Sequence, residues 1–257
     1  MSVNARLGYG YLTDGATASA TVTASGYSAS NAVVLDRSTS WKGTGTSAQR
    51  LMLNTPSAIT PTFLGICGGN YSVWGTTVLQ RSDDGVTWTN YLTLTGHASR
   101  TDTVQDYFED LTAAPTKSWW CLYWAAPTAA PEVAVFYLGT VAILTDNYSF
   151  PVKEMDVYNV DVQSTEGRIL QREQVARRLV RWVLTWTVIS STLKETIRTI
   201  IQSEGGNLRP FWFVPADETT SNTYGRAYLV GYEPPAFGID RAFTEIYEVV
   251  LPLLEEV

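Results

Sequence analysis

The clearest pattern of hydrophobic and polar positions lies between residues 175 and 215, where a strand, a helix and a second strand are predicted in succession. In the first strand, bulky apolar side chains recur at every second position, as expected of a strand with one buried face. These positions are Trp182, Leu184, Trp186 and Val188. The run Phe-Trp-Phe-Val-Pro at 211–215 predicts the second strand.

The residues between these strands predict a helix over 191–204. Apolar side chains recur there at helical spacing and form one stripe, which is the pattern of a helix packed on a sheet. The stripe consists of Leu193, Ile197, Ile200 and Ile201. Thr192 and Glu195 have the spacing of a capping box, so we expect them to start the helix. Gly205 and Gly206 are expected to end it, because glycine accepts the left-handed conformation of a helix terminus.

The first 150 residues show a different pattern, with short apolar segments, frequent turn signals and little helical periodicity. Such a sequence is typical of an antiparallel sandwich or jelly roll. The predicted strands are 49–53, 62–67, 76–81, 88–94, 119–124 and 133–138. Asp84-Gly85 predicts a tight hairpin between the third and fourth of these strands.

These patterns divide the chain into an N-terminal arm at 1–20, a jelly roll at 21–150 and a second β domain at 151–257. The predicted fold class is therefore mainly β, with one helix in the second domain. The segment 145–156 is the expected junction, and limited proteolysis is expected to cut near Asp146–Glu154.

Net charge and the distribution of apolar residues argue against nucleic-acid binding and membrane insertion. The 257 residues carry a net charge of −7, so no basic footprint for nucleic acid is present and no nucleic-acid specificity is expected. The N-terminus lacks the features of a signal peptide, and no apolar run approaches the roughly 20 residues that span a bilayer. We therefore expect synthesis in a cytoplasm and no membrane insertion. Cys67 and Cys121 are expected to be buried free thiols.

The sequence contains few residues that could form a catalytic or metal site. His97 is the only histidine, and a Ser-His-Asp relay would have to use it. His97, Cys67 and Cys121 lack the close spacing of a zinc site. We predict no catalytic residue, no cofactor and no metal.

Two acidic clusters are the remaining candidates for a glycosidase pair or a calcium site. Asp83 and Asp84 are assigned to the hairpin turn, where aspartate favours turn geometry. Asp106, Glu109 and Asp110 are interpreted as a solvated loop or a helix start, with a calcium site as the alternative.

Three motifs give the first part of the chain a resemblance to a known family. Asn31, Asp36 and Trp41 are placed like the opening of a discoidin-type domain, the galactose-binding-like jelly roll. The segment 82–88, Ser-Asp-Asp-Gly-Val-Thr-Trp, matches its hairpin, and residues 119–139 match its late strands in order. The resemblance implies a jelly roll that contacts glycans or lipids through loops at one end. Tyr71 and Trp74 lie in a loop-like stretch and are the candidate glycan contacts, with core packing as the alternative.

The second part of the chain, from about residue 157, resembles the distal-tail and minor-tail proteins of long-tailed bacteriophages. The resemblance rests on Trp-x-Leu-x-Trp before the helix and on Gly-Gly…Phe-Trp-Phe-x-Pro-x-Asp after it. It implies a tail-tube-like β domain that closes into a ring, six-fold or, in some tail tips, three-fold. Arg177, Arg178 and Arg181 are the candidate subunit contacts; the alternative is a charged edge that discourages sheet pairing.

Together these observations predict a non-enzymatic structural protein of a tailed phage or phage-derived particle, located at the tail tip. Its partners would be copies of itself, tail-tube, baseplate or fibre proteins, and a host surface glycan. The alternative is a stand-alone carbohydrate-binding module or receptor-binding protein. A glycan hydrolase is the third and least supported class, because the catalytic constellation is missing.

Overall fold

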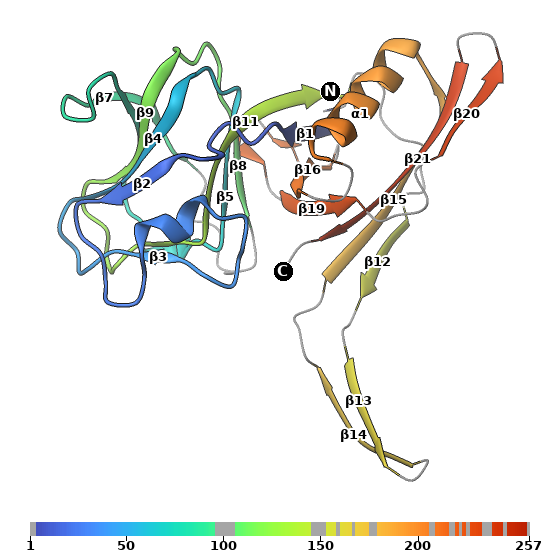
Figure 1. The fold of residues 1–257 in the computed structure, drawn as a ribbon, viewed down its shortest axis with the longest axis horizontal. Helices are drawn as coiled ribbons and strands as arrows, with labels where there is room; N and C mark the ends of the chain where they lie inside the picture. Colours follow the sequence, from blue (N-terminus) through green and yellow to red (C-terminus); the bar gives the residue numbers. More distant parts are fainter. Residues whose placement is uncertain are drawn as a thin grey trace. The chain divides into compact units, whose positions relative to one another are not determined.

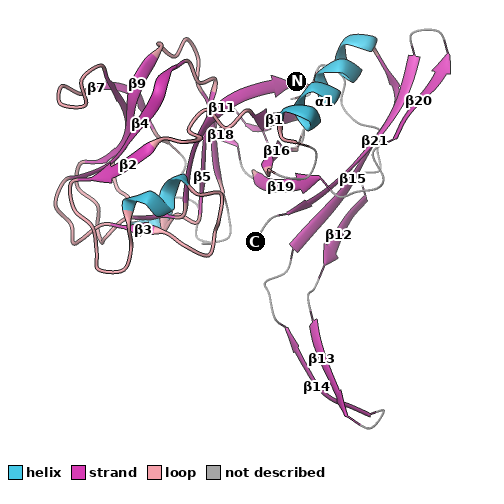
Figure 2. Cartoon of the chain, in the orientation of Figure 1, coloured by secondary structure: helices cyan, strands magenta, loops and turns pink. Residues whose placement is uncertain are grey.

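The computed structural model confirms a mainly β protein, and the residues it describes include one α-helix (Figures 1 and 2). It describes residues 4–95, 106–144, 153–157, 160–165, 168–174, 179–205, 209–215, 219–220, 223–224, 227–232, 238–243 and 246–255. The described chain separates into two compact units. The first is Met1–Ile143 with Phe211–Tyr228, and the second is Leu144–Pro210 with Leu229–Val257.

The first unit contains a sandwich of two antiparallel sheets. One sheet has five strands, in the spatial order β2 (Thr17–Ala20), β4 (Gln49–Ile59), β9 (Lys117–Trp124), β6 (Thr77–Ser82) and β7 (Thr89–Thr93). The facing sheet runs β16 (Phe211–Val214), β1 (Arg6–Tyr9), β11 (Val135–Ile143), β5 (Phe63–Cys67), β8 (Tyr107–Asp110), β18 (Thr223–Tyr224) and β17 (Thr219–Thr220). Because the chain passes repeatedly between the two sheets, the arrangement is a jelly roll, as predicted.

Smaller elements complete this unit. A separate two-stranded sheet consists of β3 (Trp41–Lys42) and β10 (Glu132–Val133). Two 3-10 helices, η1 (Ala29–Val33) and η2 (Tyr71–Val73), lie in the connections. Residues 6–9 and 17–20, predicted as an arm, form strands β1 and β2.

The core between the sheets is built from alternate residues of both. From β9, Trp120, Leu122 and Trp124 are buried in one hydrophobic cluster with residues of β4, β5, β6 and β11. On the other face of the strand, Trp119 and Tyr123 are half-buried, while Cys121 is buried beside Gln80. This period of two is the pattern of a strand with one face in the core, and it explains why the strand segments were predictable.

A second aromatic layer covers the other face of β5. The ring of Phe63 stacks on Phe108 and Tyr137 at centroid distances of 4.8 and 5.3 Å. The indole of Trp212 lies 6.0 Å from Phe108 and rests directly over the backbone of Gly65. Glycine is needed at position 65 because any Cβ there would occupy the space of the Trp212 ring.

We therefore expect Gly65→Ala to lower the free energy of unfolding by about 1–3 kcal/mol, since overpacking forces buried neighbours to shift. Urea unfolding of the variant measures this effect. Gly45→Ala serves as a comparison for the added methyl group, because no atom lies within 4 Å of a Cβ built at Gly45. Its positive φ of 64° adds only backbone strain. A Gly65→Ala variant as stable as wild type would contradict the close packing.

The second unit is a β domain that carries the helix. Its sheet has the order β12 (Lys153–Val157), β15 (Leu179–Ile189), β21 (Ile246–Glu255) and β19 (Tyr228–Tyr232), and β20 (Gly238–Phe243) also pairs with β21. A separate two-stranded sheet consists of β13 (Val160–Thr165) and β14 (Arg168–Gln174). In β15, Trp182, Leu184 and Trp186 are buried, which confirms the predicted alternation. The side chain of Val188 lies outside the described residues.

The helix α1 (Ser191–Ser203) has the predicted extent and buried stripe, but its capping residue differs from the prediction. The capping residue is Ser190, whose hydroxyl accepts a hydrogen bond from the Leu193 amide at 3.2 Å. Thr192 therefore lies inside the helix, and Glu195 forms an ion pair with Arg198 at 3.2 Å. Gly205 adopts the left-handed conformation, with φ of 67°, as expected of a helix terminus. Gly206 lies outside the described residues.

The acidic segment after residue 105 is also different from the prediction. Asp106 precedes β8, and Glu109 and Asp110 belong to it; Asp106 and Glu109 are buried rather than solvated. Asp106 and Asp110 pair with distant residues, Arg37 and Arg6, and Glu109 accepts a hydrogen bond from the nearby Tyr107 hydroxyl. A solvated loop or helix start at this position is therefore wrong.

The predicted division at residue 150 stays a prediction. The two compact units are interleaved in sequence, because residues 211–228 belong to the first unit and the segments on either side belong to the second. The expected junction from 145 lies largely outside the described residues. Within the described part of the chain, no helix combines the length and apolar character needed to cross a membrane.

Candidate functional site

The β6–β7 hairpin is held by a compact network around Asp84. Its carboxylate accepts hydrogen bonds from the Val86 and Thr87 amides at 2.8 and 2.7 Å and from the Ser82 hydroxyl at 2.8 Å. The Ser82 oxygen in turn accepts from the amides of Asp84 and Gly85. This is the turn role predicted for Asp84.

Gly85 lets an aromatic ring pack against the turn. It has a positive φ of 71°, and a Cβ at this position would lie 2.8 Å from the indole of Trp119. The Trp119 ring meets Trp88 edge to face, with centroids 6.5 Å apart. These half-buried indoles therefore pack against the hairpin. Trp88 separates Thr87 and Thr89, two residues of the hairpin that line the cavity described next.

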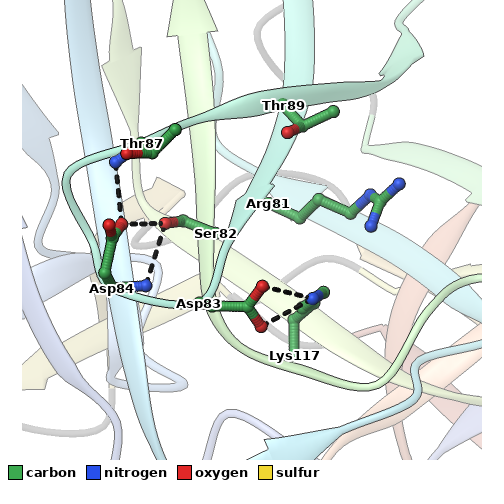
Figure 3. A pocket seen from close by; sticks show the side chains of 7 residues that line it. All are labelled: Arg81, Ser82, Asp83, Asp84, Thr87, Thr89 and Lys117. Carbon is green, nitrogen blue, oxygen red and sulfur yellow. Dashed lines mark hydrogen bonds and ion pairs between the residues drawn. The ribbon is translucent and has the colours of Figure 1, made fainter.

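A cavity of about 150 Å³ opens beside this hairpin (Figure 3). All of its lining residues are polar or charged. They are Arg81, Ser82, Asp83, Asp84, Thr87, Thr89 and Lys117. Figure 3 shows Asp84, Ser82 and Thr87 gathered at the turn, while the charged ends of Arg81 and Lys117 lie away from it. One side of the cavity is therefore occupied by the turn network, and the other side presents cationic groups.

Arg81 reaches the cavity from the inner face of the five-stranded sheet. It pairs in register with Trp120 on β9 and with Thr89 on β7, and residues opposed in this way share a face. Leu79, two residues earlier, is in the core. Arg81 thus occupies the end of a core-facing row, where the sandwich opens.

Among the described residues, the Arg81 guanidinium has one buried donor without an acceptor. Its Nε atom is buried and has no hydrogen-bond acceptor, and within the described part of the chain the side chain forms no ion pair. A buried donor without an acceptor costs free energy. This is the one polar group of the cavity whose bonding is left incomplete at a buried atom.

Lys117 is bound differently. Its ammonium lies 2.6 and 2.5 Å from the two carboxylate oxygens of Asp83. The Asp83 side chain is 80% exposed, so water screens this pair and it contributes little to stability. The pair therefore sits at the mouth of the cavity as an exchangeable contact.

The predicted glycan contacts are in the core instead. Tyr71 is 1% exposed and Trp74 is fully buried. The Tyr71 hydroxyl donates to the Ile66 carbonyl at 2.7 Å, and the Trp74 indole donates to the Asn70 side chain at 3.0 Å. Rings without accessible surface offer no face to a sugar, so the alternative of core packing holds for both residues, although they lie in a connection between strands.

The predicted interface residues are only partly described. Arg181 lies in β15, is half-buried and pairs in register with Leu254 and Met155. Arg177 and Arg178 lie outside the described residues, as does His97. The subunit interface stays a prediction.

Both cysteines are buried free thiols, as predicted. Burial raises the pKa of the Cys121 thiol to about 12, so almost no reactive thiolate exists near neutral pH. The described residues hold no group of three or more side chains suited to a metal ion.

Sequence reasoning missed Arg81, Thr89 and Lys117. One signal was present, because Thr77, Leu79 and Arg81 are alternate residues of one strand and the third carries a charge at a core-facing position. The contribution of Lys117, which lies 36 residues beyond Arg81 at the start of β9, follows only from the strand pairing.

The turn network predicts a pH dependence of stability. Hydrogen bonds from the Thr87 and Val86 amides and from the Ser82 hydroxyl hold the pKa of Asp84 well below its ordinary value of 3.8. A carboxyl with a depressed folded-state pKa contributes stability above the unfolded-state pKa and loses it as the pH falls through the folded-state pKa. The unfolding free energy of wild type should therefore fall as the pH drops below about 4, and Asp84→Asn should show a weaker dependence.

Urea unfolding of both proteins between about pH 5 and pH 2 measures this difference. Asp36→Asn is the comparison variant, because the pKa of Asp36 is also lowered by hydrogen bonds, from Ser38, but outside the hairpin. Identical pH profiles for wild type and Asp84→Asn would contradict the assigned role of the carboxylate.

Comparisons with known proteins find structures that resemble about half of this chain. One is a mutant of chitosan-binding module 1 from a chitosanase/glucanase of Paenibacillus sp. IK-5, at 20% identity and a TM-score of 0.43, covering 51% of this chain and 98% of that one. Another is the family 32 carbohydrate-binding module of Clostridium perfringens NanJ in complex with galactose, at 14% identity and a TM-score of 0.44, covering 53% and 99%.

A further module from Clostridium perfringens, in complex with GalNAc-β-1,3-galactose, gives 11% identity and a TM-score of 0.43, covering 50% of this chain and 98% of that one. No family model matches the sequence, and no curated protein matches it. At these identities the similarity concerns the fold alone.

Proposed function

We propose that the jelly roll is a non-catalytic glycan-binding module and that its sugar binds in the cavity beside the β6–β7 hairpin. The observation that carries this proposal is a polar cavity of about 150 Å³ in which the buried Arg81 Nε lacks an acceptor. A small number of placed polar groups in a concave site is the usual basis of ligand specificity.

The lining suits a sugar. Thr87 and Thr89 offer hydroxyls, Arg81 and Lys117 offer charged donors, and Asp83 offers an acceptor. The volume corresponds to about five waters at roughly 30 Å³ each, which is room for one sugar ring or for the end of a longer chain. A cavity of this size suits a module that binds one sugar unit better than an enzyme that needs an extended substrate cleft.

The carboxylates of the cavity argue against hydrolysis. A glycosidase needs a carboxylic acid with a raised pKa to protonate the leaving group. Hydrogen bonds instead lower the pKa of Asp84, which keeps it ionised and committed to the turn. Asp83 is paired with Lys117. Neither group is therefore suited to act as the general acid.

A binding assay with a blocked cavity tests the proposal. The full chain is applied to an array of neutral and acidic oligosaccharides that includes galactose- and chitosan-type sugars. Thr89→Phe fills the cavity, and Thr93→Phe makes the same change at an exposed position of the same strand. We expect wild type and Thr93→Phe to bind a common set of glycans and Thr89→Phe to lose at least tenfold in affinity, about 1.4 kcal/mol.

Two outcomes would contradict the proposal. One is the absence of binding by wild type to any glycan on the array. The other is equal affinity of wild type and Thr89→Phe, which would show that the glycan binds elsewhere.

A second candidate function is the tail-tip subunit of a phage or phage-derived particle, assembled as a ring with tail-tube, baseplate or fibre proteins. The observation in its favour is that β13 and β14 form a two-stranded sheet of their own. Isolated two-stranded ribbons are marginally stable, so a neighbouring subunit is a reasonable support for this one. Cryo-microscopy of assembled particles tests this candidate: a ring on the tail axis would support it, and absence from particles would refute it.

A further inference from the structure

We infer that the ligand of the β6–β7 cavity is an acidic glycan and that Arg81 binds its anionic group. This inference rests on the proposed function, since it specifies the chemistry of the sugar that the cavity takes.

The charged side chains that line the cavity differ in whether they already have a partner. Asp84 is committed to the amides and hydroxyl of the turn. Asp83 is paired with Lys117 at 2.5 Å. Among the residues that the structure describes, no carboxylate is paired with Arg81. The lining therefore holds two cations and two carboxylates, and among the described residues Arg81 is the cation of the lining that is in no ion pair.

The geometry of Arg81 specifies the missing partner further. Its Nε is buried and without an acceptor, so the donors of the guanidinium that a ligand can reach are its terminal nitrogens. A carboxylate can accept from two of these N–H groups at once, in the bidentate arrangement that makes such pairs strong. A neutral hydroxyl would accept from one donor and leave the guanidinium without an ion pair.

Lys117 strengthens the preference for an anion. Its present partner, Asp83, is largely exposed, and exposed pairs of this kind are worth about 0–1 kcal/mol. A ligand anion can therefore share the ammonium at little cost. Thr89, opposite Arg81 in the β6–β7 register, adds a hydroxyl donor on the same face.

The alternative is that Arg81 only covers the end of the core with its aliphatic stem. Leu79 and Trp120 are its neighbours on that face, so the stem has an apolar surface to cover. This alternative predicts an effect on stability and none on ligand choice, so a comparison of ligands separates the two roles.

The test uses the full chain and two oligosaccharides that differ at one position. Trigalacturonate carries a carboxylate where trigalactose carries a hydroxymethyl group; a 6-sulfated trigalactose is the third ligand. Titration calorimetry at about 50 and 200 mM salt is expected to show at least tenfold tighter binding of the two acidic sugars, weakening as salt rises. Tighter binding of the carboxylate than of the sulfate would reflect the planar fork of Arg81.

Arg81→Gln removes the charge and is expected to abolish the preference for acidic sugars while neutral binding remains. Arg81→Lys keeps the charge but lacks the planar guanidinium, so it should retain a reduced preference for acidic sugars. It replaces Arg81→Gln in the comparison if that variant does not fold. Arg50→Gln is the matched control, because Arg50 lies over the Tyr123 ring at 4.5 Å, outside the cavity lining. It should bind like wild type.

The outcomes separate the two proposals. Equal binding of neutral and acidic sugars by wild type overturns the inference and leaves the glycan-binding proposal standing. Absence of binding to all three sugars, together with a negative array, overturns both. A preference for acidic sugars that survives in Arg81→Gln also overturns the inference, since the anion would then be bound by other groups.

Discussion

Replacing Trp186 with alanine is expected to lower the free energy of unfolding of the second unit by about 3–5 kcal/mol. Trp186 is 1% exposed and lies in β15, opposite Val249 of β21. Truncating a buried aromatic side chain removes its transfer free energy and leaves a cavity that the surroundings fill only in part. The variant should melt early or aggregate.

Thr185→Ala is the matched control for this change. Thr185 is adjacent in the same strand but half-buried on the other face, so its truncation should change the unfolding free energy by less than about 1 kcal/mol. Urea unfolding followed by tryptophan fluorescence and circular dichroism compares the three proteins. Normal unfolding of Trp186→Ala would show that the second unit does not depend on this residue for its core.

Removing the charge of Asp106 is expected to have an effect of similar size in the first unit. The Arg37 guanidinium binds both carboxylate oxygens of Asp106, at 2.6 and 3.1 Å, and the Asp106 side chain is 1% exposed. Asp106→Asn keeps the shape but removes one charge of a buried ion pair, and breaking such a pair from one side typically costs about 3–5 kcal/mol.

Two comparisons identify the cause of that loss. Lys42→Gln removes a half-exposed pair with Glu132, 3.2 Å long, and should cost no more than about 1 kcal/mol. The double variant Arg37→Met/Asp106→Leu should regain much of the loss, because no unpaired charge is left. An Asp106→Asn variant as stable as wild type would mean that the pair does not fix the segment around Arg37.

Much of the fold could be predicted because its signals are local. The period of two in β9 and β15 and the stripe of α1 place apolar side chains on one face whatever the rest of the chain does. The Asp84-Gly85 turn was predictable for the same reason, since the hydrogen bonds that form it come from residues 82–87.

Other features depend on distant parts of the chain and were not predictable. Asp106 appears as a solvated acid in the sequence, but its partner Arg37 lies 69 residues away. The sequence places Trp74 in a loop-like stretch, yet its ring packs edge to face against Trp124 at 5.4 Å. The helix is capped two residues earlier than predicted because both Ser190 and Thr192 can cap a helix, and the sequence does not tell them apart.

The candidate site shows the same limit. The hairpin was identified from its motif, but the cavity beside it requires Arg81 and Lys117 to converge from two paired strands. The sequence pointed instead to Tyr71 and Trp74 by residue type alone. Residue type predicts which side chains can bind a sugar, whereas the fold decides which of them have accessible surface.

The central claim is that the jelly roll binds a glycan at the β6–β7 cavity. Amide NMR spectra of the full chain, recorded during titration with trigalacturonate, test it most directly because they locate the bound ligand. We predict that the shifted resonances cluster at residues 81–89 and around Lys117 and that Thr89→Phe abolishes the shifts. Shifts centred elsewhere in the chain, or none at a saturating concentration of any glycan bound on the array, would contradict the claim.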